Sequence, residues 1–93
     1  MVQISLVVIT LNEESNLPRC LESARGIVDE IVVVDSGSTD NTVAIAGSFG
    51  ARVIVQPFLG HVGQKQFAID QASNDYVLSL DADEALSDRK SVV

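Results

Sequence analysis

The chain has 93 residues, enough for one small domain, and 46% of them are hydrophobic, which excludes an intrinsically disordered chain. Its net charge of -7 argues against a nucleic acid or an anionic membrane surface as the main partner. Aromatic residues make up only 4%, so Val, Ile, Leu and Ala must form the core, which favours a parallel sheet buried on both faces.

The first apolar run, Ile4–Ile9, predicts a buried strand. A helix is expected next, with Ser15 as its N-cap, Pro18 in its first turn and Gly26 as its stop. Cys20 lies in this helix, and we interpret it as a small buried hydrophobic residue rather than a nucleophile. The chain has one cysteine and can form no internal disulfide, which fits a reducing compartment.

The second unit repeats this order. Residues Glu30–Asp35 predict a strand, and Thr39 or Asp40 can cap a helix that ends at Gly50. Residues Ala51–Val55 predict the third strand.

A loop, a helix and a strand complete the pattern. They are expected at Gln56–Gly63, at about Gln64–Ala72 and at Tyr76–Leu80. Alternating strands and helices predict an α/β fold, a Rossmann-like three-layer αβα arrangement with a mostly parallel sheet. The strand order 3-2-1-4 is expected, because it brings the ends of strands one, two and four together.

Membrane and export signals are not evident in the pattern. No stretch approaches the roughly 18 apolar residues that a membrane helix needs. Residues Met1–Ile9 are apolar, but no basic segment precedes them and Asn12, Glu13 and Glu14 follow, which does not fit a signal peptide. We therefore expect a cytoplasmic location for the soluble form, and for the intact protein a peripheral place on the inner face of the membrane.

Polar residues follow three of the four predicted strands, at Thr10–Glu14, Asp35–Ser38 and Asp81–Glu84. In an open parallel sheet, ligands bind outside the carboxyl ends of the strands, where the strand order reverses. These three loops together therefore predict a binding site at one edge of the sheet.

Asp81 and Asp83 are candidates for a metal site. If the extended backbone continues past Leu80, both carboxylates lie on one side, and their repulsion calls for a cation. Mg²⁺ commonly takes one or two carboxylates and completes its shell with water and substrate phosphates, and Mn²⁺ accepts the same ligands. The alternative is a solvated acidic turn.

The other candidates are ligand contacts. Asp35 can accept a hydrogen bond from a base or a ribose, or it can simply end its strand and cap the next helix. Gly37 would let the backbone approach the ligand. Lys65, at the start of the third predicted helix, is expected to contact a ligand, whereas His61 alone is weak evidence for catalysis. We expect replacement of Asp35 by Ala to weaken nucleotide binding without loss of stability.

Four segments together resemble the nucleotide-sugar-binding half of glycosyltransferase family two, which has the GT-A fold. They are Val7–Glu14, Ile31–Thr42, Gly63–Ala68 and Tyr76–Glu84. The Asp-Ala-Asp-Glu ending and the Gln-Lys-Gln-Phe-Ala helix look most like bacterial lipopolysaccharide-core β-glucosyltransferases. One departure is Asp35-Ser36-Gly37-Ser38, where most relatives read Asp-Asp-Gly-Ser.

The resemblance implies a nucleotide sugar donor, most often a UDP-hexose, and a divalent metal, Mn²⁺ or Mg²⁺. Thr10 and Asn12 match the first-strand loop that lines the nucleotide pocket, and Glu13 lies beside them. Asp35 matches the carboxylate that contacts the uracil, and Lys65 falls where the family often has a basic residue near the base.

Asp81 and Asp83 match the family's Asp-x-Asp motif, which contacts the ribose and the metal-diphosphate. The resemblance implies inverting transfer of a hexose to a glycan or lipid-linked acceptor. The family continues past this motif with the acceptor site and the catalytic base. We therefore expect residues 1–93 to be a single domain of a longer enzyme, with the base beyond Val93. This part alone is expected to transfer no sugar.

Two alternatives remain at this point. A nucleotidyltransferase of related fold would want a Gly-rich, basic loop after the first strand, and Thr10–Glu14 is acidic and has no Gly. A receiver-like, Mg²⁺-binding signalling module would need its acidic pair directly after the first strand, whereas Glu13 and Glu14 come after Asn12. The edge formed by the last strand also makes self-association an option for this chain.

Overall fold

The computed structural model describes residues 2–85. Strands and helices alternate throughout this range, as the sequence predicts. In chain order the elements are β1 (Ile4–Thr10), α1 (Leu17–Ala24), β2 (Glu30–Asp35), α2 (Thr42–Ser48), β3 (Arg52–Val55), α3 (His61–Asp70) and β4 (Tyr76–Asp81).

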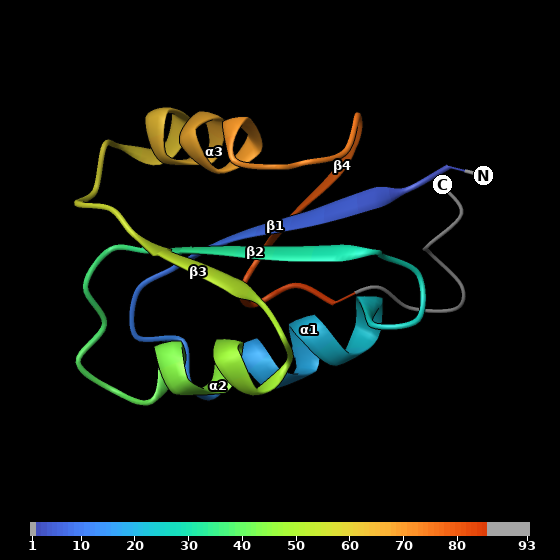
Figure 1. Ribbon diagram of the computed structural model, residues 1–93. Helices are drawn as coiled ribbons and strands as arrows, with labels where there is room; N and C mark the ends of the chain where they lie inside the picture. The colour runs from blue at the N-terminus through green and yellow to red at the C-terminus, as the bar shows by residue number, and fades with distance from the viewer. Residues whose placement is uncertain (1, 86–93) are drawn as a thin grey trace.

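The four strands form one parallel sheet in the order β3-β2-β1-β4. Helix α3 covers one face of this sheet, and α1 and α2 lie together on the other, so the three-layer prediction and the strand order are confirmed (Figure 1). The carboxyl ends of β1, β2 and β4 lie side by side, because β1 is paired with both of the other strands.

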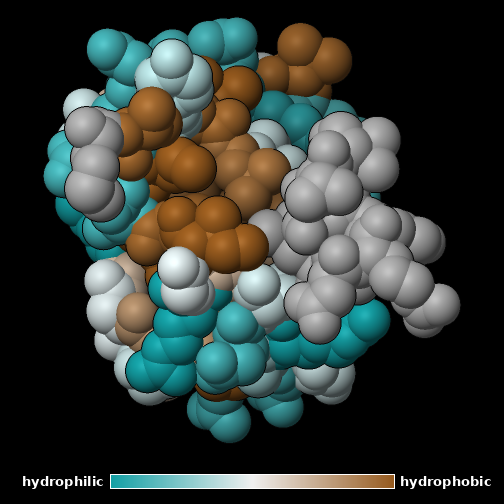
Figure 2. All heavy atoms as spheres, turned by 90° about the vertical axis from the view of Figure 1, so that its right-hand side faces the viewer, coloured by the Kyte–Doolittle hydropathy of each residue, from teal (hydrophilic) through white to brown (hydrophobic). Residues whose placement is uncertain are grey.

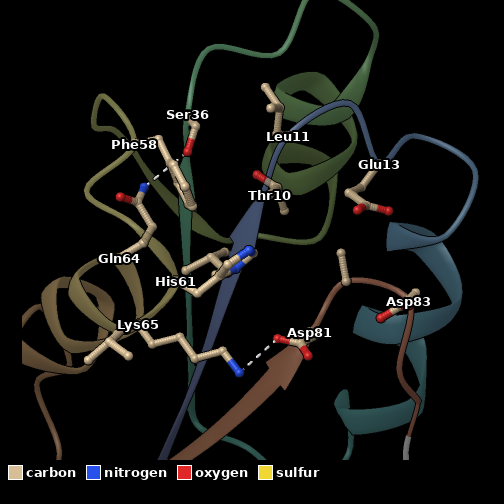
Figure 3. A pocket seen from close by; sticks show the side chains of 13 residues that line it. Thr10, Leu11, Glu13, Ser36, Phe58, His61, Gln64, Lys65, Asp81 and Asp83 are labelled. Carbon is tan, nitrogen blue, oxygen red and sulfur yellow. Dashed lines mark hydrogen bonds and ion pairs between the residues drawn. The ribbon is translucent and has the colours of Figure 1, made fainter.

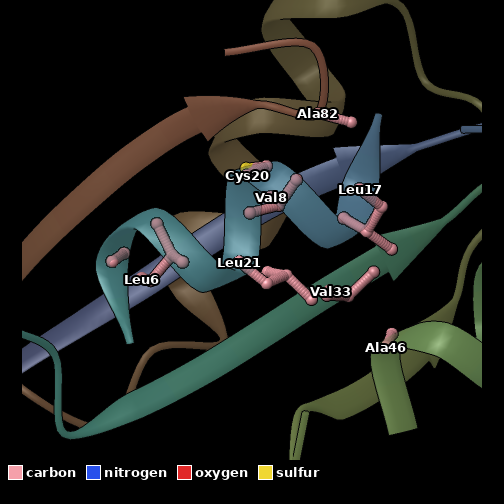
Figure 4. Close-up of a cluster of buried hydrophobic side chains, with 9 residues drawn as sticks. Leu6, Val8, Leu17, Cys20, Leu21, Val33, Ala46 and Ala82 are labelled. Carbon is pink, nitrogen blue, oxygen red and sulfur yellow. The ribbon is translucent and has the colours of Figure 1, made fainter. Parts of the chain in front are cut away.

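Period-two alternation along the strands builds a core on each face. Leu6, Val8 and Val33 pack against α1 and α2, and Figure 4 shows these side chains meeting those of both helices. Val7, with Val32 and Val34, packs on the α3 side. Because side chains alternate in this way, odd-numbered and even-numbered residues of any one strand face different helix layers.

Two helix starts differ from the prediction. Asn16, not Ser15, occupies the N-cap position of α1 and makes no side-chain cap bond. The Leu17 N–H instead donates to the backbone oxygen of Glu13 at 2.8 Å, because a tight turn precedes the helix. The N-cap position of α2 is held by Asn41, not by Thr39 or Asp40, and Asn41 makes no side-chain cap bond. Asp40 lies just before it and accepts the Thr42 N–H at 2.9 Å.

Helix α3 begins at His61, three residues before the predicted start. Gly60 holds the N-cap position with φ of 87°, a left-handed conformation that favours glycine. Gly63 belongs to the first helical turn rather than to the loop. A β-carbon built on it would lie 3.1 Å from Cβ of Leu59, so its small size serves a close approach.

The surface carries apolar residues as well as charges. Figure 2 shows hydrophobic side chains gathered in the middle of the side where the chain begins, flanked by polar residues. Strands β3 and β4 are the outer strands of the sheet, and the self-association expected from the β4 edge stays a prediction. Within residues 2–85, none of the helices has the length and apolar content needed to cross a membrane.

Candidate functional site

Strand alternation sorts the residues at the carboxyl edge of the sheet into two groups. Thr10 and Asp35 have the parity of Leu6 and Val33 and face the α1–α2 layer, where they are register partners. Asp81 has the parity of Val77 and faces α3. The aspartates that end β2 and β4 therefore face opposite sides of the sheet.

A pocket of about 710 Å³ opens at this edge, between the strand ends and the start of α3 (Figure 3). Its volume is in the range of small-molecule sites. The lining residues are Ile9, Thr10, Leu11, Glu13, Ser36, Phe58, His61, Val62, Gln64, Lys65, Asp81, Ala82 and Asp83. The pocket thus brings together five predicted site residues, namely Thr10, Glu13, Lys65, Asp81 and Asp83.

Asp81 points toward α3, where its Oδ1 lies 3.1 Å from Nζ of Lys65 (Figure 3). Both side chains remain nearly half exposed, at 45% and 44%. The backbone N–H of Asp81 donates to Oε1 of Glu84 at 2.7 Å, which steadies the chain as it leaves β4. The Asp81 carboxylate is therefore open to the pocket and is balanced by a single lysine.

The extended backbone assumed for the Asp-x-Asp pair is wrong. The strand ends at Asp81, and a turn follows in which the Glu84 N–H donates to the Asp81 backbone oxygen at 2.9 Å. Ala82 is 3% exposed and packs into the α1–α2 core, which draws the chain into this turn. Asp83 is exposed, and both carboxylates still line the same pocket.

Cys20 lies beneath this turn, close to its carboxylates. Its Sγ lies 3.7 Å from the Asp81 backbone oxygen. Burial, followed by the negative charges of Glu84, Asp81 and Asp83, raises the pKa of the Cys20 thiol to about 11. A thiol in this state is no nucleophile, as the sequence predicts.

Asp35 is 1% exposed and does not line the pocket. Its Oδ1 accepts hydrogen bonds from the hydroxyls of Thr10 at 2.7 Å and Ser38 at 2.6 Å. Its Oδ2 accepts the N–H groups of Gly37 at 2.9 Å and Ser38 at 2.7 Å. Burial alone would raise the pKa of Asp35, but the hydrogen bonds from Ser38, Thr10 and Gly37 outweigh it and hold the pKa below its usual value.

These contacts contradict the expectation that Asp35 can be replaced by Ala without loss of stability. That expectation assumed a carboxylate crowded by Asp81 and Asp83, whereas Asp35 faces the opposite layer and accepts four hydrogen bonds. Removing it would leave two buried or half-buried N–H groups and two hydroxyls without this acceptor, which is costly.

Asn12 and Gly37 shape the loops beside the pocket rather than its lining. Asn12 adopts φ of 52°, its N–H donates to Oγ of Ser38 at 2.7 Å, and its Oδ1 accepts the Thr39 N–H at 2.8 Å. Gly37 has φ of 107°, which a residue with a side chain rarely adopts. The hydrogen bonds of Asn12 join the loop after β1 to the loop after β2, and Gly37 permits the turn in the second of these loops.

Sequence reasoning missed part of the lining. Ser36, Phe58 and Gln64 had no assigned role, and His61 was set aside as a lone histidine. Phe58 and His61 meet edge to face with ring centroids 5.3 Å apart. The available signal was an aromatic residue in a loop with Pro57 and Gly60, placed just before a helix that starts at the pocket.

Among residues 2–85 there is no group of three or more His, Cys, Asp or Glu side chains that could hold a metal by themselves. A metal held here would need further oxygen ligands, which substrate phosphates and water supply in many Mg²⁺ sites.

The comparisons with known proteins give the class. Residues 5–91 match the sequence pattern of glycosyl transferase family 2. The chain belongs to glycosyltransferase family 2, and it has the fold of an enzyme that transfers sugar residues. The nucleotidyltransferase and receiver-like alternatives are set aside by this match.

Individual relatives agree with the family. An uncharacterized glycosyltransferase of Rickettsia felis is 55% identical over 87 residues, covering 94% of this chain and 31% of the relative. The lipopolysaccharide core biosynthesis glycosyltransferase LpsC of Rhizobium meliloti is 44% identical over 88 residues, covering 89% of this chain and 32% of the relative. The chain thus spans about a third of the length of these relatives.

A solved structure of similar fold is glucosyl-3-phosphoglycerate synthase from Mycobacterium tuberculosis in complex with UDP. It superposes with a TM-score of 0.73 at 33% identity, covering 89% of this chain and 34% of that protein. The same enzyme is also known in complex with Mn²⁺ and UDP-glucose. The similarity confirms the GT-A type of fold for the part that this chain covers.

Proposed function

We propose that this chain binds the nucleotide sugar donor of a glycosyltransferase, a UDP-sugar, together with Mn²⁺ or Mg²⁺. The observation that carries the proposal is the opening of Asp81 and Asp83 into one pocket at the carboxyl edge of the sheet. The related synthase with bound UDP, and its complex with Mn²⁺ and UDP-glucose, support this choice of ligands.

The charges of the pocket favour a metal. Glu13, Asp81 and Asp83 supply three carboxylates to its lining, and Lys65 is the one lysine or arginine among the lining residues. A diphosphate entering this pocket would meet like charge unless a cation comes with it. Carboxylate oxygens are the ligands that Mg²⁺ and Mn²⁺ prefer, and two of them with substrate phosphates fit the Mg²⁺ pattern.

In this proposal the lining residues divide between the metal and the nucleotide. Asp83 and Asp81 hold the metal, which when bound supplies positive charge to the diphosphate leaving group. Lys65 releases Asp81 and turns to the nucleotide. Thr10 and Glu13 line the nucleotide side of the pocket.

Asn12, Gly37 and Asp35 support the nucleotide from the neighbouring loops. Asp35 fixes the turn at Gly37 and Ser38 through its carboxylate. A direct contact from Asp35 to a base would require it to exchange one of its present donors. Its first task in this proposal is therefore to hold the turn.

For the whole protein we propose inverting transfer of a hexose to a glycan or lipid-linked acceptor. The match to a lipopolysaccharide core enzyme supports an acceptor of this kind. We propose no residue of this chain as the base that removes the proton of the acceptor hydroxyl.

The test is a titration of UDP into the ¹⁵N-labelled chain, with and without Mg²⁺. We expect Mg²⁺-dependent shifts confined to the loops at residues 10–13, 35–38 and 81–84. Asp83→Ala should weaken binding about tenfold or more, because a charged contact contributes roughly 1.5–3 kcal/mol. Asp75→Ala, an exposed change before the same strand, is the matched control and should bind as the wild type does. Equal binding without metal, or in Asp83→Ala, would reject the proposal.

A further inference from the structure

Gln64 is a polar side chain that is fully buried, with 0% of it exposed. It lies in the first turns of α3 and reaches toward the residue that follows β2 (Figure 3). Its Oε1 accepts the Leu59 N–H at 3.0 Å. Its Nε2 donates to Oγ of Ser36 at 3.1 Å and to the backbone oxygen of Gln56 at 3.2 Å.

The chemistry of these partners fixes which way the amide points. The Leu59 N–H can only donate, so it needs the oxygen of Gln64, and the Gln56 carbonyl can only accept, so it needs the nitrogen. A glutamate at this position would lose both donated bonds, and a methionine would lose all three. Glutamine therefore satisfies all three partners, and neither glutamate nor methionine can.

The bonds from Gln64 hold a loop whose shape is already restricted. Residues 56–60 lead into α3, and the Gln64 N–H donates to the Gly60 backbone oxygen at 2.8 Å. Leu59 lies close against Gly63, and Gly60 is in a left-handed conformation. This loop presents Phe58 to the pocket, where Phe58 meets His61.

Ser36 follows the last residue of β2, and Gln64 holds its side chain. Its Oγ accepts the hydrogen bond from Gln64, so the hydroxyl hydrogen is left to turn toward the pocket that Ser36 lines. The side chain of Gln64 thus connects two walls of the pocket, one from β2 and one from the 56–60 loop.

We infer that Gln64 is a positioning residue for the donor. It holds Ser36 and the 56–60 loop in the arrangement that binds the donor, before the donor arrives. The identity of the donor rests on the proposed function. Order built in before binding raises affinity, because less freedom is lost when the ligand enters. Gln64 acts through Ser36 and the loop, and no contact of its own with the donor is required.

Two variants and a matched control test this inference. Gln64→Met keeps the length of the side chain and removes its three hydrogen bonds, and Gln64→Glu keeps the acceptor for Leu59 and removes the donors. Gln66→Met changes an exposed glutamine on the same helix, whose Nε2 bonds to Asp70. Each protein is measured at a temperature where circular dichroism shows it folded, by UDP titration with Mg²⁺ and by hydrogen exchange of the Leu59 amide.

For Gln64→Met we expect UDP affinity to fall about tenfold and exchange at Leu59 to become fast, because the loop loses its anchor. Gln64→Glu should keep slow exchange at Leu59 yet bind UDP more weakly than the wild type, because Ser36 is released. Gln66→Met should match the wild type in both. A folded Gln64→Met protein with wild-type affinity and slow Leu59 exchange would overturn the inference.

The wild-type protein gives a result even where a variant does not fold. The inference requires the Leu59 amide to exchange as slowly as hydrogen-bonded amides of α3 without any ligand present. Fast exchange there overturns it, and slow exchange supports it. If the wild type binds no UDP, the donor-binding proposal fails, whereas the exchange at Leu59 still decides whether Gln64 holds the loop.

Discussion

Strands β2 and β4 both end in an aspartate at the same edge of the sheet, yet the two carboxylates have opposite surroundings. Asp35 is 1% exposed and accepts four hydrogen bonds from neighbouring groups. The side chain of Asp81 is 45% exposed, and within residues 2–85 its carboxylate is paired with Lys65. The first carboxylate holds its neighbouring loop together, whereas the second leaves oxygen surface open to the pocket.

The largest difference in stability is expected between the same substitution made at Asp35 and at Asp81. Asp35→Asn replaces an acceptor oxygen by an NH₂ group that faces donors, and should lower the free energy of unfolding by about 2–3 kcal/mol, or roughly 10–20 °C in Tm. Asp81→Asn should change it by less than about 0.5 kcal/mol, as is usual for exposed positions. Thermal unfolding of both variants checks this. Equal destabilisation by the two changes would remove the distinction between them.

A second carboxylate used by the fold lies at the other end of β2. Glu30 accepts hydrogen bonds from Ser5 at 2.7 Å and from the N–H and hydroxyl of Ser73, both at 2.8 Å, and it lies 3.5 Å from Arg52. The backbone hydrogen bond from Ser73, then the Ser5 hydroxyl, lower the pKa of Glu30 to about 2.

The pH dependence follows from the sign of this shift. A carboxyl whose pKa is lowered in the folded state adds stability above its ordinary pKa of 4.5, and that stability is lost as pH falls toward 2. Glu30→Gln should therefore lose about 1–2 kcal/mol at neutral pH and lie closer to the wild type near pH 2. Glu22→Gln, at a side chain that is 61% exposed, is the control and should change little. A difference between Glu30→Gln and wild type that stays constant with pH would contradict this.

A smaller effect than at Asp35 or Glu30 is expected at Lys65. Its ion pair with Asp81 is half exposed, so Lys65→Met should alter stability by less than about 1 kcal/mol. Without nucleotide, Mg²⁺ affinity should rise a few-fold, because the cation that competes for Asp81 is gone. Calorimetric titration of Mg²⁺ measures this. Weaker Mg²⁺ binding in the variant would show that Lys65 does not compete with the metal.

The order of strands and helices could be predicted because short β-branched runs such as Glu30–Asp35 strongly favour strands, and turn residues separate these runs clearly. The start of α3 could not, because Gly63 signals a loop in a sequence, and its role in a close approach to Leu59 is visible only in three dimensions. Boundaries depend on such contacts more than on composition.

The location of the pocket could be predicted from the sequence, but the surroundings of its individual side chains could not. Three polar loops at one sheet edge indicate a pocket, and five predicted residues line it. The division between Asp35 and Asp81 follows from which layer each residue faces, and the turn at Ala82 follows from its burial in the core. Gln64 was overlooked because a glutamine near the start of a helix is normally solvated.

Paramagnetic broadening by Mn²⁺ in the presence of UDP tests the central claim most directly. The account predicts that amide signals at residues 81–84 broaden first, that residues 10–13 follow, and that Asp83→Ala abolishes the effect while Asp75→Ala keeps it. Broadening centred on Asp29 and Glu30 at the other end of the sheet, or broadening unchanged in Asp83→Ala, would contradict the assignment of the metal and nucleotide to the carboxyl end of β4.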